Sequence, residues 1–133
     1  MTATLNIRDE SMFGASVPDY FFTLNFPSDR VTAREVIERR VRQEVENYNQ
    51  AQPEVFRGLI QPTASERVLN GFRFKEKKRI DWRAQYEKAI EAFERNGFIL
   101  LVDDLQIEDT DQIIEIEAHT TVTFLKLVPL VGG

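Results

Sequence analysis

The chain has 133 residues, of which 42% are hydrophobic and 29% charged, and its formal net charge is −5. This suits one folded domain, and the acidic balance argues against a general nucleic-acid binder. With no Cys and one His, the chain excludes disulfide scaffolds, thiolate zinc sites and cysteine nucleophiles. The longest apolar run, at 98–102, is far below the roughly 20 residues of a membrane span, and the first eight residues lack the layout of a secretion signal. We expect a soluble cytoplasmic protein.

Two strands are predicted near the start of the chain. Apolar and polar residues alternate over 4–8 and again over 20–26. In the second segment, alternate apolar residues share one face, whereas Phe21 falls on the other face. We therefore expect both faces of this strand to be at least partly covered.

A capping box predicts the start of a long helix. Thr32 and Glu35 have the spacing at which each side chain can bond to the backbone amide of the other. Apolar residues then recur at helical spacing, with charged residues on the opposite face. These apolar residues are Ala33, Val36, Ile37, Val41, Val45 and Tyr48. We expect about four to five helical turns lying on a sheet.

The segment 49–97 reads as an insert with a second helix. Periodicity fades over 49–63, and 66–74 is typical of a strand or a hairpin that turns at Asn70–Gly71. Asp81 is the predicted cap of the second helix, which ends at Asn96–Gly97. The expected apolar stripe of this helix is Trp82, Tyr86, Ala89, Ile90 and Phe93.

The remaining sequence predicts the other strands of a sheet. Residues 98–102 have the composition of a buried central strand, and 105–107 form a short strand. Residues 113–117 are expected to be extended or tightly turned, and a final strand over 120–128 ends at Pro129.

This order of elements predicts an α+β fold, namely a β-grasp mixed sheet with one long helix. The second helix belongs to the insert, 49–97. We expect a single domain over 1–128, followed by a flexible carboxyl-terminal tail over 129–133.

Three segments resemble the second half of ubiquitin. They are FILLVDDLQIED at 98–109, IIEIE at 113–117 and TTVTFLKLVPLVGG at 120–133. The turn at 27–29 is similar to the entry of the ubiquitin helix. The insert has no counterpart in ubiquitin. Together with the LVPLVGG end, it makes the chain similar to bacterial ubiquitin-like proteins, which are encoded beside homologues of an activating enzyme, a conjugating enzyme and a JAB-type peptidase.

The resemblance implies protein modification, with a role in antiphage defence. The chain would be a substrate and not an enzyme, and it would need no cofactor of its own. The partner activating enzyme would use ATP to convert the Gly133 carboxylate into an acyl-adenylate, which a conjugating enzyme passes to an amine or hydroxyl of a target protein. A JAB-type peptidase would reverse the linkage. Gly132 and Gly133 lack a Cβ, which lets them thread a narrow channel.

The residues before the glycines differ from those of ubiquitin, which are basic there. Pro129 would stiffen the exit from the sheet, and Leu130 and Val131 would be apolar anchors for tail recognition. An apolar tail cannot form the same charge pairs, so we expect a dedicated activating enzyme.

Two further sets of residues carry expectations. Leu125 and Leu127 fall near the apolar patch of ubiquitin and form a candidate partner surface, or belong to the core if Val122 and Phe124 face outward. The candidate acceptors for self-conjugation are Lys75, Lys77, Lys78, Lys88 and Lys126.

Other functions stay open at this point. The same chain end could become the thiocarboxylate of a sulfur carrier, although such carriers lack an inserted helix. The chain could also be a β-grasp interaction module that is never conjugated. A bare Gly-Gly is otherwise typical of a frayed terminus.

Charged clusters give weaker signals. Glu115, Glu117 and His119 alternate as metal ligands could, but a solvated sheet edge explains them, and we predict no metal site. The acidic residues over 103–111 are typical of turns, and the basic run at 73–79 is typical of a solvated loop. An acidic block over 103–117 and a basic block over 67–83 could steer head-to-tail self-association.

Overall fold

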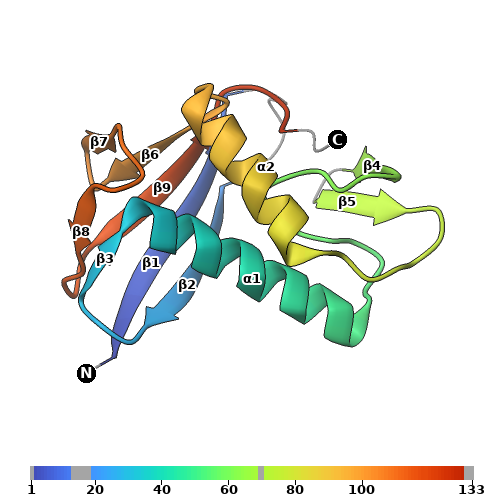
Figure 1. Ribbon diagram of the computed structural model, residues 1–133, viewed down its shortest axis with the longest axis horizontal. Helices are drawn as coiled ribbons and strands as arrows, with labels where there is room; N and C mark the ends of the chain where they lie inside the picture. Colours follow the sequence, from blue (N-terminus) through green and yellow to red (C-terminus); the bar gives the residue numbers. More distant parts are fainter. Residues whose placement is uncertain (1, 13–18, 69–70, 131–133) are drawn as a thin grey trace. The chain divides into compact units, whose positions relative to one another are not determined.

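The computed structural model describes residues 2–12, 19–68 and 71–130 (Figure 1). These residues form an α+β structure with two helices, a mixed sheet of five strands and two sheets of two strands. The chain divides into two compact units. The first, Met1–Val36 with Asn96–Pro129, is called the sheet unit here; the second, Ile37–Arg95 with Leu130–Gly133, is called the helical unit.

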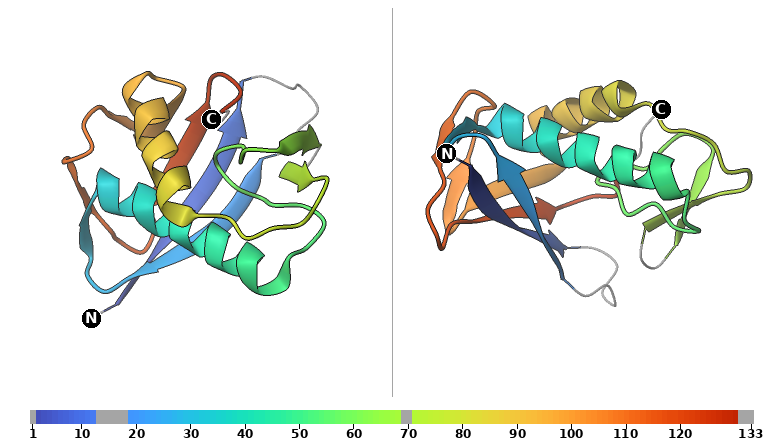
Figure 2. Two further views of the ribbon diagram at one scale, coloured as in Figure 1. Left: turned by 45° about the vertical axis from the view of Figure 1, so that its right-hand side comes forward. Right: turned by 90° about the horizontal axis from the view of Figure 1, so that it is seen from below.

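The sheet unit is built on five strands. They are β1 (Ala3–Ser11), β2 (Tyr20–Phe26), β6 (Phe98–Val102), β7 (Leu105–Ile107) and β9 (Thr121–Lys126). Their order across the sheet is β2-β1-β9-β6-β7 (Figures 1 and 2). The β1–β9 pair is parallel, and the other neighbours are antiparallel. The strands predicted over 20–26, 98–102 and 105–107 are confirmed at their bounds.

Apolar side chains from the central strands form the core of the sheet unit. The register aligns Ile7 of β1 with Val122 of β9 and Val122 with Val102 of β6. Two residues further along β9, Phe124 pairs with Leu100 of β6. Val122 and Phe124 are fully buried, so burial of apolar surface by alternate residues stabilises this face.

The opposite face of β2 differs from the prediction. Phe21 is 66% exposed, so the expected covering of this side chain is wrong. The Arg8 guanidinium lies 5.8 Å from the centre of the Phe21 ring and donates hydrogen bonds to Asp19 at 3.0 and 2.6 Å. The bond to Asp19 raises the pKa of Arg8. The exposed Phe21 ring therefore forms a cation–π contact with Arg8.

A small two-stranded sheet precedes the first helix. β3 (Arg30–Thr32) pairs antiparallel with β8 (Ile113–Glu115). The extended conformation expected for 113–117 is confirmed over the residues of β8. β3 was not predicted, because three residues between a turn and a helix cap are too few to show alternation.

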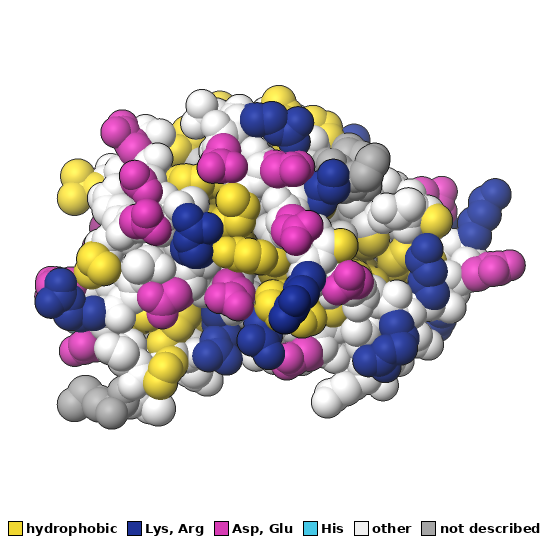
Figure 3. All heavy atoms as spheres, viewed as in Figure 1, with side chains coloured by type: hydrophobic (Ala, Val, Ile, Leu, Met, Phe, Trp, Pro, Cys, Tyr) yellow, Lys and Arg dark blue, Asp and Glu magenta, His cyan; other side chains and the backbone are white. Residues whose placement is uncertain are grey.

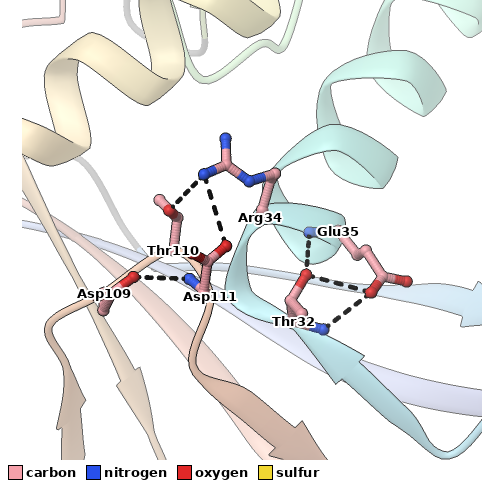
Figure 4. A network of polar contacts seen from close by, with 6 residues as sticks. All are labelled: Thr32, Arg34, Glu35, Asp109, Thr110 and Asp111. Atoms are coloured by element: carbon pink, nitrogen blue, oxygen red, sulfur yellow. Dashed lines mark hydrogen bonds and ion pairs between the residues drawn. The ribbon is translucent and has the colours of Figure 1, made fainter.

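The capping box between Thr32 and Glu35 starts α1 (Ala33–Ala51) as predicted (Figure 4). The Glu35 N–H donates to Thr32 Oγ1 at 3.1 Å, and the Thr32 N–H donates to Glu35 Oε1 at 3.2 Å. The predicted apolar stripe of α1 is buried along its whole length. α1 begins in the sheet unit and continues in the helical unit.

The loop before β8 satisfies further amides at the start of α1. The Arg34 N–H donates to the Thr110 carbonyl at 2.8 Å, and its guanidinium donates to Thr110 Oγ1 at 2.8 Å. Figure 4 shows this side chain reaching over Thr110 and Asp111. The backbone bond supplies an acceptor for an amide that has none within the first turn of the helix, and the side-chain bond ties Arg34 to the same loop.

We expect Thr32→Ala to lower the free energy of unfolding by about 1 kcal/mol, because the cap bond to the Glu35 amide is lost. Urea unfolding measures the difference. Thr32→Ser keeps the hydroxyl and should retain most of the native free energy of unfolding. The exposed Thr63→Ala provides a matched control. Equal stabilities for Thr32→Ala and the native chain would contradict the role of this cap.

The helical unit contains the rest of α1, a hairpin and a second helix. The hairpin joins β4 (Ser65–Val68) to β5 (Gly71–Phe74), and α2 spans Trp82–Glu94. The predicted cap is confirmed, since Asp81 Oδ1 accepts from the Arg83 N–H at 3.0 Å. Asn96 follows α2 with a left-handed φ of 60°, as expected for the stop. Asn70, expected in the hairpin turn, lies outside the described residues.

The buried face of α2 differs from the expected stripe. Its buried residues are Gln85, Ala89, Ala92 and Phe93. The other members of the expected stripe, Trp82, Tyr86 and Ile90, are only half-buried. The stripe is therefore rotated toward Gln85, a polar residue that the apolar pattern did not include.

Three aromatic rings meet in the helical unit. Tyr48 of α1 lies 5.4 Å from Phe56 and 5.7 Å from Phe74 of β5, measured between ring centres. Tyr48 is 3% exposed. Burial of the phenol raises its pKa, an effect that the nearby Lys77 partly offsets.

The raised pKa of Tyr48 predicts a loss of stability at alkaline pH. Below about pH 10 the phenol is neutral in both the folded and the unfolded chain, so its contribution is fully present. Above that pH the unfolded chain releases a proton that the folded chain retains, so the free energy of unfolding falls. Urea unfolding from pH 8 to 11 should show a steeper fall for the native chain than for Tyr48→Phe. Parallel curves would contradict the assignment.

Candidate functional site

The expected site begins where β9 ends. β9 lies between β1 and β6 and stops at Lys126, two residues before the predicted end. After the strand, the N–H groups of Leu127 and Val128 both donate to the Gly97 carbonyl, at 2.9 and 3.4 Å. The chain therefore leaves the sheet at a fixed place. Pro129, which follows, is exposed.

Leu130 is not exposed as a free tail would be. It is 7% exposed, and its carbonyl accepts a hydrogen bond from the Gln61 N–H at 2.8 Å. It belongs to the helical unit, whereas Pro129 belongs to the sheet unit. This differs from the expectation of a flexible tail from Pro129 onward. The remaining expected site residues, Val131, Gly132 and Gly133, lie outside the described residues.

Polar side chains hold the segment that bonds to Leu130. Glu44 of α1 accepts from the Leu59 N–H at 2.8 Å, and Gln85 of α2 donates to the Ile60 carbonyl at 2.8 Å. Arg40, which is 2% exposed, donates to the other oxygen of Glu44 and neutralises it. These residues were not predicted from the sequence. A signal was present for Arg40 and Glu44, because both continue the spacing of the apolar stripe of α1.

The candidate partner surface on β9 lies opposite the core. Val122 and Phe124 are fully buried, so the alternative in which they face outward is wrong. Leu125 alternates with them and pairs with Ile99 of β6, and both are half-buried. Leu127 is half-buried as well. These residues place partly accessible apolar side chains on the outer face of the sheet.

The five candidate acceptor lysines differ in accessibility. Those with side chains at or near the surface are Lys75, Lys77, Lys78 and Lys88. The Lys126 side chain is 22% exposed, and its Nζ lies 3.8 Å from Asp9 Oδ2, a carboxylate that is itself 11% exposed. An acceptor amine attacks only when it is reachable. Lys126 is therefore the least accessible of the five.

The basic run contains neutralised side chains. Arg73 donates to Glu66 at 2.8 Å, and Lys77 lies 3.2 Å from Glu54. Around β5, Figure 3 shows acidic side chains among the basic ones. Residues 75–79 are exposed and lie outside any strand, which supports the solvated-loop interpretation for that part. Arg73 and Phe74 instead belong to β5, and Phe74 is buried.

The acidic residues form turns. Asp103 has a left-handed φ of 53°, and its Oδ1 accepts from the Thr121 N–H at 3.2 Å. Asp109 accepts from the Asp111 N–H at 2.8 Å (Figure 4). The turn interpretation of these residues is confirmed.

Neither a metal centre nor a membrane-spanning helix occurs in the described part of the chain. Glu115, Glu117 and His119 are all exposed, and across 2–12, 19–68 and 71–130 no three His, Asp or Glu residues gather as metal ligands. In the same ranges neither helix has the length and apolarity needed to cross a bilayer.

The chain matches no family model, no curated protein and no solved structure with which it was compared. The geometry of the strands and of the segment after β9 is thus the basis for assigning a function.

Proposed function

We propose that the chain is a ubiquitin-like protein modifier with a β-grasp fold. Its carboxyl-terminal glycine would be activated by a partner enzyme that uses ATP, and then joined to amines of target proteins. Such a pathway would act in the bacterial cytoplasm and serve antiphage defence.

The observation that carries the proposal is the order of the sheet. Numbered along the chain as first to fifth, β1, β2, β6, β7 and β9 have the spatial order 2-1-5-3-4, with the first and fifth strands parallel. This is the strand order of the β-grasp sheet of ubiquitin, and it supports the assignment to that fold. A helix follows the second strand in the same position along the chain.

The position of the fifth strand suits a modifier. β9 is bonded on both sides, by β1 and by β6, so the residues that follow it start from a rigid base. A terminal carboxylate is inert until ATP converts it to an acyl-adenylate, and a rigid base lets a partner recognise the body while it acts on the end. The outer-face residues Leu125 and Leu127 would supply part of that recognition.

Intact-mass measurement tests the proposal. The chain ending at Gly133 is incubated with ATP and with the activating and conjugating enzyme homologues expected to be encoded beside it. An isopeptide remnant of the chain end on a target lysine supports the modifier. Exchange of oxygen for sulfur at the chain end identifies a sulfur carrier instead, and an unchanged mass identifies an interaction module that is not conjugated.

A further inference from the structure

Leu130 lies four residues after the end of β9 and is held by the helical unit. Its carbonyl accepts from the Gln61 N–H at 2.8 Å, and the residue is 7% exposed. Backbone pairing and side-chain burial thus act on the same residue, which lies two positions before the glycines on which the proposed function depends.

The segment that contains Gln61 is held by hydrogen bonds that do not involve Leu130. The Leu59 N–H and the Ile60 carbonyl are bonded to Glu44 and Gln85, as described above. On the other side, Gln61 Nε2 donates to the Ser65 carbonyl at 2.9 Å. A donor held from both sides loses little conformational entropy on pairing, which favours the docked state.

Docking shortens the reach of the chain end. Gly133 lies seven residues after Lys126, which fully extended span about 25 Å, but only three residues after Leu130, which span about 10 Å. We propose that the pairing of Leu130 with Gln61 is an autoinhibitory contact, which must open before an activating enzyme can thread the tail to Gly133. This inference rests on the proposed function.

The contact is of a kind that a partner can replace. A channel that binds an extended, apolar tail can supply both an equivalent backbone hydrogen bond and an apolar site that buries the leucine. A partner that binds only the released tail shifts the equilibrium by its preference for that state. The insert thereby restricts activation to enzymes that compete for Leu130.

Amide hydrogen exchange at Gln61 tests the docking without any partner enzyme. In the native chain the Gln61 amide should be protected. Leu130→Asp, which places a charge in the buried site, should speed its exchange at least about tenfold. Val128→Asp alters a half-exposed residue two positions before Leu130 and should leave the exchange unchanged. Equal exchange in all three chains would overturn the proposal.

Trimming by a carboxypeptidase of broad specificity tests the gating. The enzyme should remove Leu130 from the native chain about tenfold more slowly than from Gln61→Pro, which lacks the donor N–H. Gln61→Ala keeps that N–H and loses only the side-chain bond to Ser65, so its rate should lie closer to that of the native chain than to that of Gln61→Pro. Equal rates for the native chain and Gln61→Pro would overturn the gate.

The partner reaction separates this inference from the proposed function. With the activating enzyme homologue, Gln61→Pro should raise kcat/KM for formation of the adenylate. If activation is unchanged while trimming is faster, the regulatory inference is wrong and the modifier function stands. If no chain is activated, the modifier function fails, while exchange and trimming still decide whether Leu130 is docked.

Discussion

Replacing Arg40 with alanine is expected to lower the free energy of unfolding by about 3–5 kcal/mol. Arg40 is 2% exposed and donates to Glu44, whose carboxylate is 11% exposed and also accepts from the Leu59 N–H. Removal of the cation takes the ion pair away from a mostly buried carboxylate, and this costs much more than the loss of packing. Urea unfolding followed by circular dichroism measures the change.

A double variant distinguishes the charge effect from packing. Arg40→Met with Glu44→Gln removes both charges and keeps an acceptor for the Leu59 N–H, so the loss should be much smaller than for Arg40→Ala alone. The exposed Arg95→Ala should change stability by less than about 0.5 kcal/mol. If Arg40→Ala proves as mild as Arg95→Ala, the ion pair does not hold the helical unit together.

Deleting Gly132 and Gly133 should abolish conjugation and leave the unfolding temperature nearly unchanged. The deletion removes the carboxylate that ATP activates, whereas the core residues of the sheet, including Val122 and Phe124, are untouched. Intact-mass analysis of the reaction with ATP and partner enzymes reads out the first effect, and thermal unfolding reads out the second.

Gly132→Ala provides the matched variant for this deletion. It keeps the chain length and the terminal carboxylate but adds a Cβ where close approach is needed, so activation should slow without being lost. A large fall in melting temperature after the deletion would show instead that these residues are structural. Conjugation that survives the deletion would show that a different group is activated.

The elements that depend on local chemistry were predictable from the sequence. The Thr32–Glu35 box and the Asp81 cap act over two or three residues, and both form the bonds expected of them. The strand over 98–102 could be predicted from its composition alone, because a fully bonded central strand favours β-branched and large apolar residues. β3, in contrast, is too short to carry a pattern.

The contacts around the candidate site were not predictable in the same way. Gln61 lies in a segment without periodicity, and its partner Leu130 is far along the chain, so no spacing rule connects them. Arg40 and Glu44 did occupy the spacing of the buried stripe, but charged residues are normally assigned to a solvated face. Such a buried ion pair can be predicted only if both charged residues are assigned to the buried stripe.

The parallel pairing of β1 with β9 has a consequence for synthesis of the protein on the ribosome. β1 emerges early, but its partner in the middle of the sheet is not complete until Lys126 has been made. Until then β1 and β6 each lack a neighbour, and a nascent chain with such open edges is prone to aggregation. Incomplete products of translation would therefore not fold into the sheet.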